Sequence, residues 1–183
     1  MSELSLPVFK YHPDPISSGS VVVSDLKCRA CYQYRGFIYT GAVYSTYDLD
    51  NALCPWCIFD GTAHRLFDAE FVDPKAVGDY GRWDEVPDSA IEEVCFRTPS
   101  FNAWQEERWF THCGDAAEFV APVGAAELRH LGPSLYKAIA EESGFLSEES
   151  TRYMDSLDKD AGPTVYAFRC RVCGAWGGYS DSH

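Results

Sequence analysis

Six of the eight cysteines form three Cys-x-x-Cys pairs, at Cys28/Cys31, Cys54/Cys57 and Cys170/Cys173. A Cys-x-x-Cys turn places two sulfurs on one side of a tight loop, where they can share a tetrahedral Zn²⁺ with two further ligands. The first two pairs lie close in the sequence, and the aromatic segment 36–44 between them is a candidate hairpin. The sequence therefore predicts a zinc-ribbon-like element over residues 28–57. Its ligands would be Cys28, Cys31, Cys54 and Cys57.

The third pair needs two more ligands to close a structural zinc site. His112 and Cys113 stand at the end of an expected strand, which is a natural position for ligands. A second zinc site is therefore expected from Cys113, Cys170 and Cys173. Its fourth ligand is His112 or another residue, because neighbours in an extended strand point to opposite faces of the sheet. The alternative is a dithiol that holds no metal.

Two enzymatic interpretations stay open beside the structural one. Cys54-Pro55-Trp56-Cys57 is similar to the dithiol of a thiol oxidoreductase, whose first cysteine needs a helix N-terminus to lower its pKa. A zinc hydrolase would need an open coordination position at the third pair, with Glu107 or Asp115 as the base. The chain has no His-Glu-x-x-His motif and no phosphate-binding loop. A protein without catalytic or cofactor-binding residues is therefore the main expectation.

The charge of the chain is strongly one-sided. Among 183 residues, 15 are Lys or Arg and 28 are Asp or Glu, which gives a net charge of −13. Nucleic-acid binding needs clustered basic residues to displace counterions, so direct binding to nucleic acid is not expected. Docking on anionic lipid is disfavoured for the same reason. Electrostatic complementarity favours a basic protein as the partner.

Short strands and several helices predict a single α+β domain over residues 1–183. The expected strands cover 21–23, 36–44, 101–113, 164–168 and 176–179, and the last two form a C-terminal Cys-x-x-Cys hairpin over 164–183. The expected helices cover 58–67, 88–96 with Asp88 as its cap, 125–144 with a break at Gly132-Pro133, and 147–157 capped by Ser147. Residues 73–87 are expected to form a loop, and the aromatic segment 101–110 is expected in the core.

The cytoplasm is the expected location. The sequence contains no apolar run of about 18–20 residues that could span a bilayer. The first ten residues lack the basic start and apolar stretch of a secretory signal. A reducing compartment disfavours disulfides, so metal binding or redox chemistry has to explain the cysteines.

Several segments make the chain similar to the CbrC-like family. They are Leu6–Pro15, Gly36–Ser45, Leu53-Cys54-Pro55-Trp56-Cys57-Ile58, Arg97-Thr98-Pro99, Trp109–Asp115 and Phe168–Gly174. The resemblance implies a small cytosolic bacterial protein with no established enzymatic activity, and it places the family's cysteine pairs at the three pairs above. The family's namesake is linked to tolerance of the nuclease toxin colicin E2. The resemblance and the charge together suggest a zinc-stabilised binding protein, an immunity or tolerance factor against a basic nuclease toxin. A regulator that contacts nucleic acid through its zinc ribbon is a further alternative.

Overall fold

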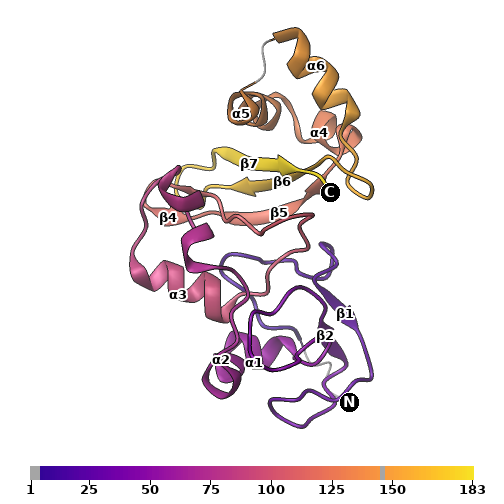
Figure 1. Cartoon of the computed structure of the whole chain (residues 1–183), viewed down its shortest axis with the longest axis vertical. Helices are drawn as coiled ribbons and strands as arrows, with labels where there is room; N and C mark the ends of the chain where they lie inside the picture. Colours follow the sequence, from indigo (N-terminus) through magenta and orange to yellow (C-terminus); the bar gives the residue numbers. More distant parts are fainter. Residues whose placement is uncertain (1–4, 145–146) are drawn as a thin grey trace.

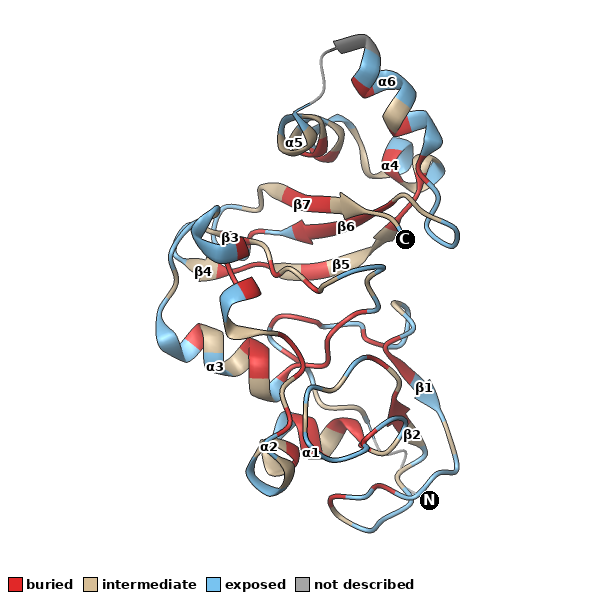
Figure 2. Cartoon of the chain, in the orientation of Figure 1, coloured by how far each residue is buried: buried red, intermediate tan, exposed pale blue. Residues whose placement is uncertain are grey.

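The computed structural model describes residues 5–144 and 147–183 and has an elongated outline (Figure 1). Residues up to about 70 form one end, which has little regular structure. A three-stranded sheet with helices on its outer face forms the other end. Short antiparallel strands and several helices make this an α+β fold, as predicted. Three groups of buried side chains follow one another along the long axis (Figure 2).

The first end is built around a hairpin and two short helices. Strands β1 (Val21–Val23) and β2 (Phe37–Tyr39) pair antiparallel, and the first cysteine pair lies in the loop between them. Helix α1 (Pro55–Phe59) begins directly after Cys54, with proline at its first position, where the missing N–H costs nothing. Gly61 has φ +73° and separates α1 from α2 (Thr62–Phe67). The single helix expected over 58–67 is therefore wrong, because the chain reverses at this glycine.

A three-stranded sheet organises the other end, in the order β5 (Glu118–Val123), β6 (Thr164–Arg169) and β7 (Trp176–Asp181). The central strand β6 is buried on both faces. Val165 and Ala167 pack under the helices, whereas Tyr166 and Phe168 face the aromatic core with Phe119 of β5. The β6–β7 hairpin agrees with the predicted C-terminal hairpin. Strand β5 was not predicted, because it contains Pro122, which is tolerated only on an edge strand.

Helices α4 (Ala125–Leu131), α5 (Pro133–Ser143) and α6 (Ser147–Ser156) cover the outer face of the sheet (Figure 1). The break at Gly132-Pro133 is confirmed, and Gly144 ends α5 in a left-handed conformation. Helix α6 ends within a residue of its expected end. The side chain of Ser147, its expected cap, lies outside the described residues. Within the part of the chain that the structure describes, no helix has the length and apolarity needed to cross a membrane.

The expected strand over 101–113 is wrong for most of its length. Thr111–His112 forms β3 and pairs with β4 (Asp115–Ala116), and Trp109 forms an isolated parallel bridge with Val77. The backbone N–H groups of Trp104 and Arg108 donate instead to the hydroxyls of Tyr166 and Tyr179, both at 3.0 Å. Tyrosine hydroxyls from the sheet thus accept these N–H groups, which the carbonyl groups of a neighbouring strand would otherwise accept. The expected core role of this segment is confirmed at Phe101, which is buried and stacks on Phe119 of β5.

The segment between the two ends contains one longer helix and two single turns. The expected loop 73–87 contains the 3₁₀ turns η1 (Pro74–Ala76) and η2 (Asp79–Gly81). Helix α3 (Asp88–Arg97) follows, but its N-cap is Pro87, and Asp88 is its first helical residue and makes no side-chain cap. The prediction that Asp88 caps this helix is therefore wrong. Its carboxylate still lies in the first turn, where it suits the helix dipole.

Candidate metal centres

Four cysteines converge at the first end of the molecule and form cluster 1. Cys28 and Cys31 come from the β1–β2 loop, Cys54 is the N-cap of α1, and Cys57 lies within α1. All four Sγ atoms lie within 4.8 Å of one another, and those of Cys31 and Cys54 are 3.9 Å apart. Tetrahedral zinc with Zn–S bonds of about 2.3 Å separates its sulfurs by about 3.8 Å. The cluster therefore has the size that a tetrahedral metal ion requires.

The loop that carries Cys28 and Cys31 is a cysteine knuckle. We call residues 28–33 the first knuckle. The N–H of Tyr32 donates to the carbonyl of Cys28, and the N–H of Cys28 donates to the carbonyl of Gln33, both at 2.9 Å. Tyr32 has φ +57°, in the left-handed region. The turn aims both sulfurs at the same point, which is why this spacing suits a metal site.

Burial and hydrogen bonding make the protonation of cluster 1 very uneven. Hydrogen bonds from the thiols of Cys54 and Cys57 hold the pKa of Cys28 far below its ordinary value, and the N–H of Cys54 also donates to its sulfur at 3.3 Å. The same contacts raise the pKa of Cys54 to about 12 and that of Cys57 further. Thiolates this close repel one another when no cation lies between them. A divalent ion would stabilise all four as thiolates.

Cluster 2 forms at the edge of the sheet from His112, Cys113, Cys170 and Cys173, whose ligand atoms also lie within 4.8 Å of one another. Nδ1 of His112 is 3.2 Å from the sulfur of Cys113 and 3.5 Å from that of Cys173. The expectation that His112 and Cys113 point to opposite faces of a strand is wrong. Strand β3 ends at His112, and Cys113 has φ +55° in the turn that follows. The turn brings both side chains to one side, so His112 is placed where it could be the fourth ligand of a metal ion.

The second cysteine knuckle, residues 170–175, has the same hydrogen bonds as the first. The N–H of Gly174 donates to the carbonyl of Cys170 at 2.9 Å, and the N–H of Cys170 donates to the carbonyl of Ala175 at 2.8 Å. Gly174 has φ +73° and stands where Tyr32 stands in the first knuckle. The two Cys-x-x-Cys segments thus make equivalent turns, although they belong to different parts of the fold.

Cluster 2 is more open to solvent than cluster 1. Cys113 and Cys173 are exposed and Cys170 is buried, whereas three of the four cysteines of cluster 1 are buried. Burial raises the pKa of Cys170, but N–H donors from Cys173 and Val172 and the His112 ring outweigh it and lower the pKa to about 6. A hydrogen bond with Cys173 raises the pKa of Cys113 to about 11.

Gly114 is the sequence signal that indicates the geometry of His112 and Cys113. Cys113 is followed by Gly114, which has φ +70°, and a glycine after a strand indicates a turn rather than a continuing strand. Asp84 was also missed, although its Oδ2 accepts the N–H of Cys113 at 2.6 Å and fixes the turn. No pattern in the sequence connects Asp84 with a residue so far along the chain.

The eighth cysteine, Cys95, and the two carboxylates considered as zinc bases lie outside both clusters. Cys95 is buried in α3, and burial raises its pKa to about 12. Glu107 is buried elsewhere and accepts the hydroxyl of Tyr44 at 2.7 Å. Asp115 lies closer to cluster 2, but it accepts the hydroxyl of Tyr11 at 2.6 Å and pairs with basic side chains. Neither carboxylate belongs to the group of ligand atoms that forms cluster 2.

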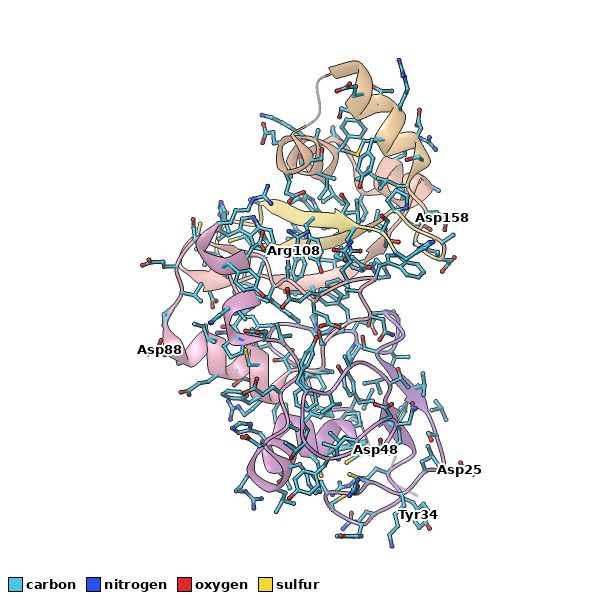
Figure 3. All side chains as sticks on the ribbon, viewed as in Figure 1. Asp25, Tyr34, Asp48, Asp88, Arg108 and Asp158 are labelled. Atoms are coloured by element: carbon cyan, nitrogen blue, oxygen red, sulfur yellow. The ribbon has the colours of Figure 1, made fainter. Side chains whose placement is uncertain are left out.

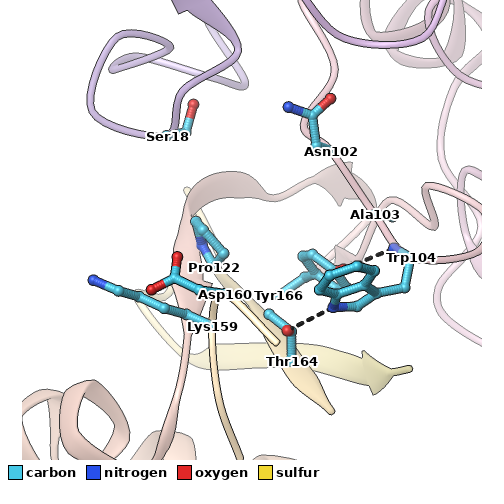
Figure 4. A pocket seen from close by; sticks show the side chains of 9 residues that line it. All are labelled: Ser18, Asn102, Ala103, Trp104, Pro122, Lys159, Asp160, Thr164 and Tyr166. Atoms are coloured by element: carbon cyan, nitrogen blue, oxygen red, sulfur yellow. Dashed lines mark hydrogen bonds between the residues drawn. The ribbon is translucent and has the colours of Figure 1, made fainter. Parts of the chain in front are cut away.

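A cavity of about 300 Å³ with a mixed polar and apolar lining lies between the two ends of the molecule (Figure 4). Indole Nε1 of Trp104 donates to Thr164 at 2.8 Å within it. Ser18 lies at its rim, and its Oγ is 2.8 Å from Nε2 of His12, whose Nδ1 is 2.7 Å from the carbonyl of Pro99. Burial lowers the pKa of His12 to about 4, so its imidazole is a weak base. These bonds tie the turn at 12–18 to the segment after α3.

The fold and the two clusters define a class: a small α+β protein with a Cys₄ and a Cys₃His cluster, both compatible with metal binding. A sequence model of the uncharacterised protein family UPF0167 matches residues 6–182. The chain belongs to this family.

Two bacterial relatives match along almost their whole length. A UPF0167 protein of Mycobacterium bovis is 42% identical over 181 residues, which cover 96% of this chain and 93% of the relative. A UPF0167 protein of Pseudomonas aeruginosa is 37% identical over 170 residues, which cover 92% of this chain and 93% of the relative. No solved structure is significantly similar to the chain.

Proposed function

We propose that this protein is a zinc-stabilised, non-enzymatic module that binds a basic protein through its acidic surface. The observation that carries the proposal is the completeness of both clusters, since each supplies four protein ligands. Structural zinc sites are closed in this way, whereas catalytic sites keep one position open for water or substrate. Thiolate-rich sets of this kind select zinc over magnesium or calcium, which prefer oxygen ligands.

An acidic face between the two ends of the molecule supports a basic partner. We define it by Glu70, Asp73, Glu106 and Asp181, with Glu107 buried beneath. Burial, and after it the neighbouring carboxylates, raise the pKa of Glu70 and of Glu107. A Lys or Arg from a partner would relieve the repulsion between these carboxylates.

The resemblance to the CbrC-like family extends the proposal to a particular class of partner. Nuclease toxins are basic because they bind nucleic acid, and an acidic rigid protein can block such a surface with fast, electrostatically steered association. The proposal is therefore an immunity or tolerance factor. It includes a location in the cytoplasm, because all eight cysteines are unpaired and zinc–thiolate sites persist in a reducing compartment.

Native mass spectrometry of protein purified without chelator tests the metal part of the proposal. The expected result is two zinc ions per chain, with the cluster thiols protected from alkylation. Absence of zinc, with a dithiol that oxidises reversibly at Cys54/Cys57, would replace the proposal with the thiol oxidoreductase. One zinc ion with an exchangeable water at cluster 2 would favour the zinc hydrolase.

Binding and neutralisation of basic nuclease domains test the partner part. Replacing Asp73 and Glu106 of the acidic face with lysine is expected to abolish binding. Lysines at Glu141 and Asp155, which are exposed on helices α5 and α6, make the same change of charge elsewhere and are the matched control. Equal losses in both variants, or no binding by the unmodified protein, would contradict the proposal.

A further inference from the structure

The first knuckle carries exposed aromatic and basic side chains at the end of the molecule opposite helices α4, α5 and α6. Tyr32 and Tyr34 are 70% and 71% exposed, and Leu26 is 49% exposed. The ammonium of Lys27 is 5.5 Å from the ring of Tyr32 and 6.0 Å from that of Tyr34, so the three side chains are contiguous. We call Leu26, Lys27, Tyr32 and Tyr34 the tip patch. Figure 3 shows Tyr34 at the lower end of the molecule, far from the sheet and its helices.

The tip patch differs in charge from the rest of the protein. Residues 26–47 contain no Asp or Glu and three basic residues, which gives their side chains a formal +3 and leaves −16 on the remaining chain. Asp25 and Asp48 flank this segment, and four thiolates with a divalent ion at cluster 1 would add a net −2 beneath it. Lys27 forms no ion pair with any described residue. Asp25 is the nearest carboxylate along the chain. A positive patch at one end of an acidic protein attracts negative groups, which the other surfaces repel.

Tyr32 holds its exposed position at a conformational cost. A bulky residue with φ near +60° is unfavourable, and the equivalent position of the second knuckle is Gly174. The turn itself therefore does not require a tyrosine. The ring buries little surface within the protein, so its packing does not offset the cost. A residue kept in a strained conformation without an internal benefit indicates a role outside the fold.

We propose that the tip patch is a docking surface for an acidic, extended peptide segment of another protein. Tyrosine is enriched at protein interfaces, because its ring supplies apolar area and its hydroxyl supplies a hydrogen bond. Lys27 would pair with an Asp or Glu of the segment, while the two rings and Leu26 would contact its apolar side chains. The site is distinct from the acidic face and takes a ligand of the opposite charge.

Two observations favour a protein segment over single-stranded nucleic acid, which also uses aromatic and basic side chains. Nucleic acid carries a phosphate at every residue, so its flanks would meet the −16 of the remaining chain. An acidic peptide carries its charge over a short stretch. The apolar side chain of Leu26, and that of Val23 at 80% exposure on the same hairpin, suit contacts with side chains rather than with a sugar–phosphate backbone.

Selection from a random peptide library on the immobilised, zinc-loaded protein tests this inference. The enriched peptides are expected to combine Asp or Glu with aliphatic or aromatic residues. Fluorescence anisotropy with a selected peptide then measures the variants. Lys27→Glu and Tyr32→Gly are each expected to weaken binding about tenfold or more, as for residues at the centre of an interface. Asp25→Asn is expected to strengthen it.

The controls separate the tip patch from general electrostatics and from misfolding. Lys137→Glu makes the same change of charge at a lysine 77% exposed on α5 and is expected to leave binding unchanged. Tyr32→Gly gives the first knuckle the glycine of the second, so zinc binding is retained. Peptides without acidic excess, or equal losses in Lys27→Glu and Lys137→Glu, would overturn the inference. Tighter binding of a short oligothymidine than of any selected peptide would reassign the tip patch to nucleic acid.

Discussion

Exchanging the residue at the left-handed position of each knuckle is expected to change zinc affinity in opposite directions. Gly174→Ala should weaken zinc binding at cluster 2, and Tyr32→Gly should leave cluster 1 as tight or tighter. The two turns have the same hydrogen bonds, and the residue that adopts positive φ is Tyr32 in one and Gly174 in the other. The pair of variants therefore isolates the backbone contribution to a metal site.

The magnitude follows from the surroundings of Gly174. A Cβ added there would meet its nearest atoms, in the Arg169 side chain, at 3.7 and 3.8 Å, which is ordinary contact. The cost is therefore conformational. The left-handed region costs a non-glycine residue about 1–2 kcal/mol, and the loss of glycine's freedom in the unfolded chain returns about 0.5–1 kcal/mol. The net cost of about 1 kcal/mol corresponds to about fivefold weaker binding.

Competition with a chromophoric chelator at fixed pH measures this change. Cobalt substitution shows which site is affected, because Cys₄ and Cys₃His sites differ in ligand set and hence in absorption. Tyr32→Gly removes a conformational strain of similar size but adds freedom to the unfolded chain. The zinc affinity of cluster 1 is therefore expected to change little or to rise slightly. A loss of more than about a hundredfold in Gly174→Ala would show that space, not backbone conformation, limits this turn. Weaker binding at cluster 1 in Tyr32→Gly would refute the equivalence of the knuckles.

Three further predictions concern stability and ligands. Burial lowers the pKa of His12 to about 4, so the unfolded chain binds the extra proton first as the pH falls below about 6.5. Stability should therefore fall by about 2 kcal/mol between pH 7 and 5, and urea titrations of His12→Gln should show a smaller fall. In Gly178→Ala, a Cβ would lie 2.1 Å from the carbonyl oxygen of Tyr166 in the neighbouring strand. This variant should lose about 3 kcal/mol in urea unfolding, and a loss below about 1 kcal/mol would contradict the strand spacing. His112→Ala should reduce the zinc count in native mass spectra by one ion, whereas His130→Ala should not. An unchanged count would remove His112 from the ligands.

The cysteine pairs could be recognised from the sequence because their chemistry is local. Spacing alone gives the turn at Cys28/Cys31 and at Cys170/Cys173, and the structure adds only that both turns have the same bonds. The role of His112 could not be derived by the same means. It depends on where β3 stops, and strand ends are set by which backbone groups find partners in the folded chain.

The same limit explains the errors in the fold. The aromatic segment 101–110 has the composition of a strand, yet tyrosine hydroxyls from the distant β6 and β7 bind its N–H groups. Strand β5 was not predicted because it contains Pro122. A proline is tolerated in a strand at the edge of a sheet, and the sequence does not show that β5 lies there. Residue composition indicated which segments are buried, whereas pairing between distant segments decided which of them are extended.

The two clusters also differ in how much chain they close into a loop. Treated as a cross-link, cluster 1 joins segments separated by the short stretch between Cys31 and Cys54, whereas cluster 2 closes the long stretch between Cys113 and Cys170. The chain-entropy relation for cross-links gives about 3 kcal/mol for the shorter loop and about 4 kcal/mol for the longer one. The metal would thus do in a reducing environment what a disulfide does outside the cell. The more exposed cluster closes the longer loop. How well ordered the segment between Cys113 and Cys170 is would therefore depend on the availability of the metal.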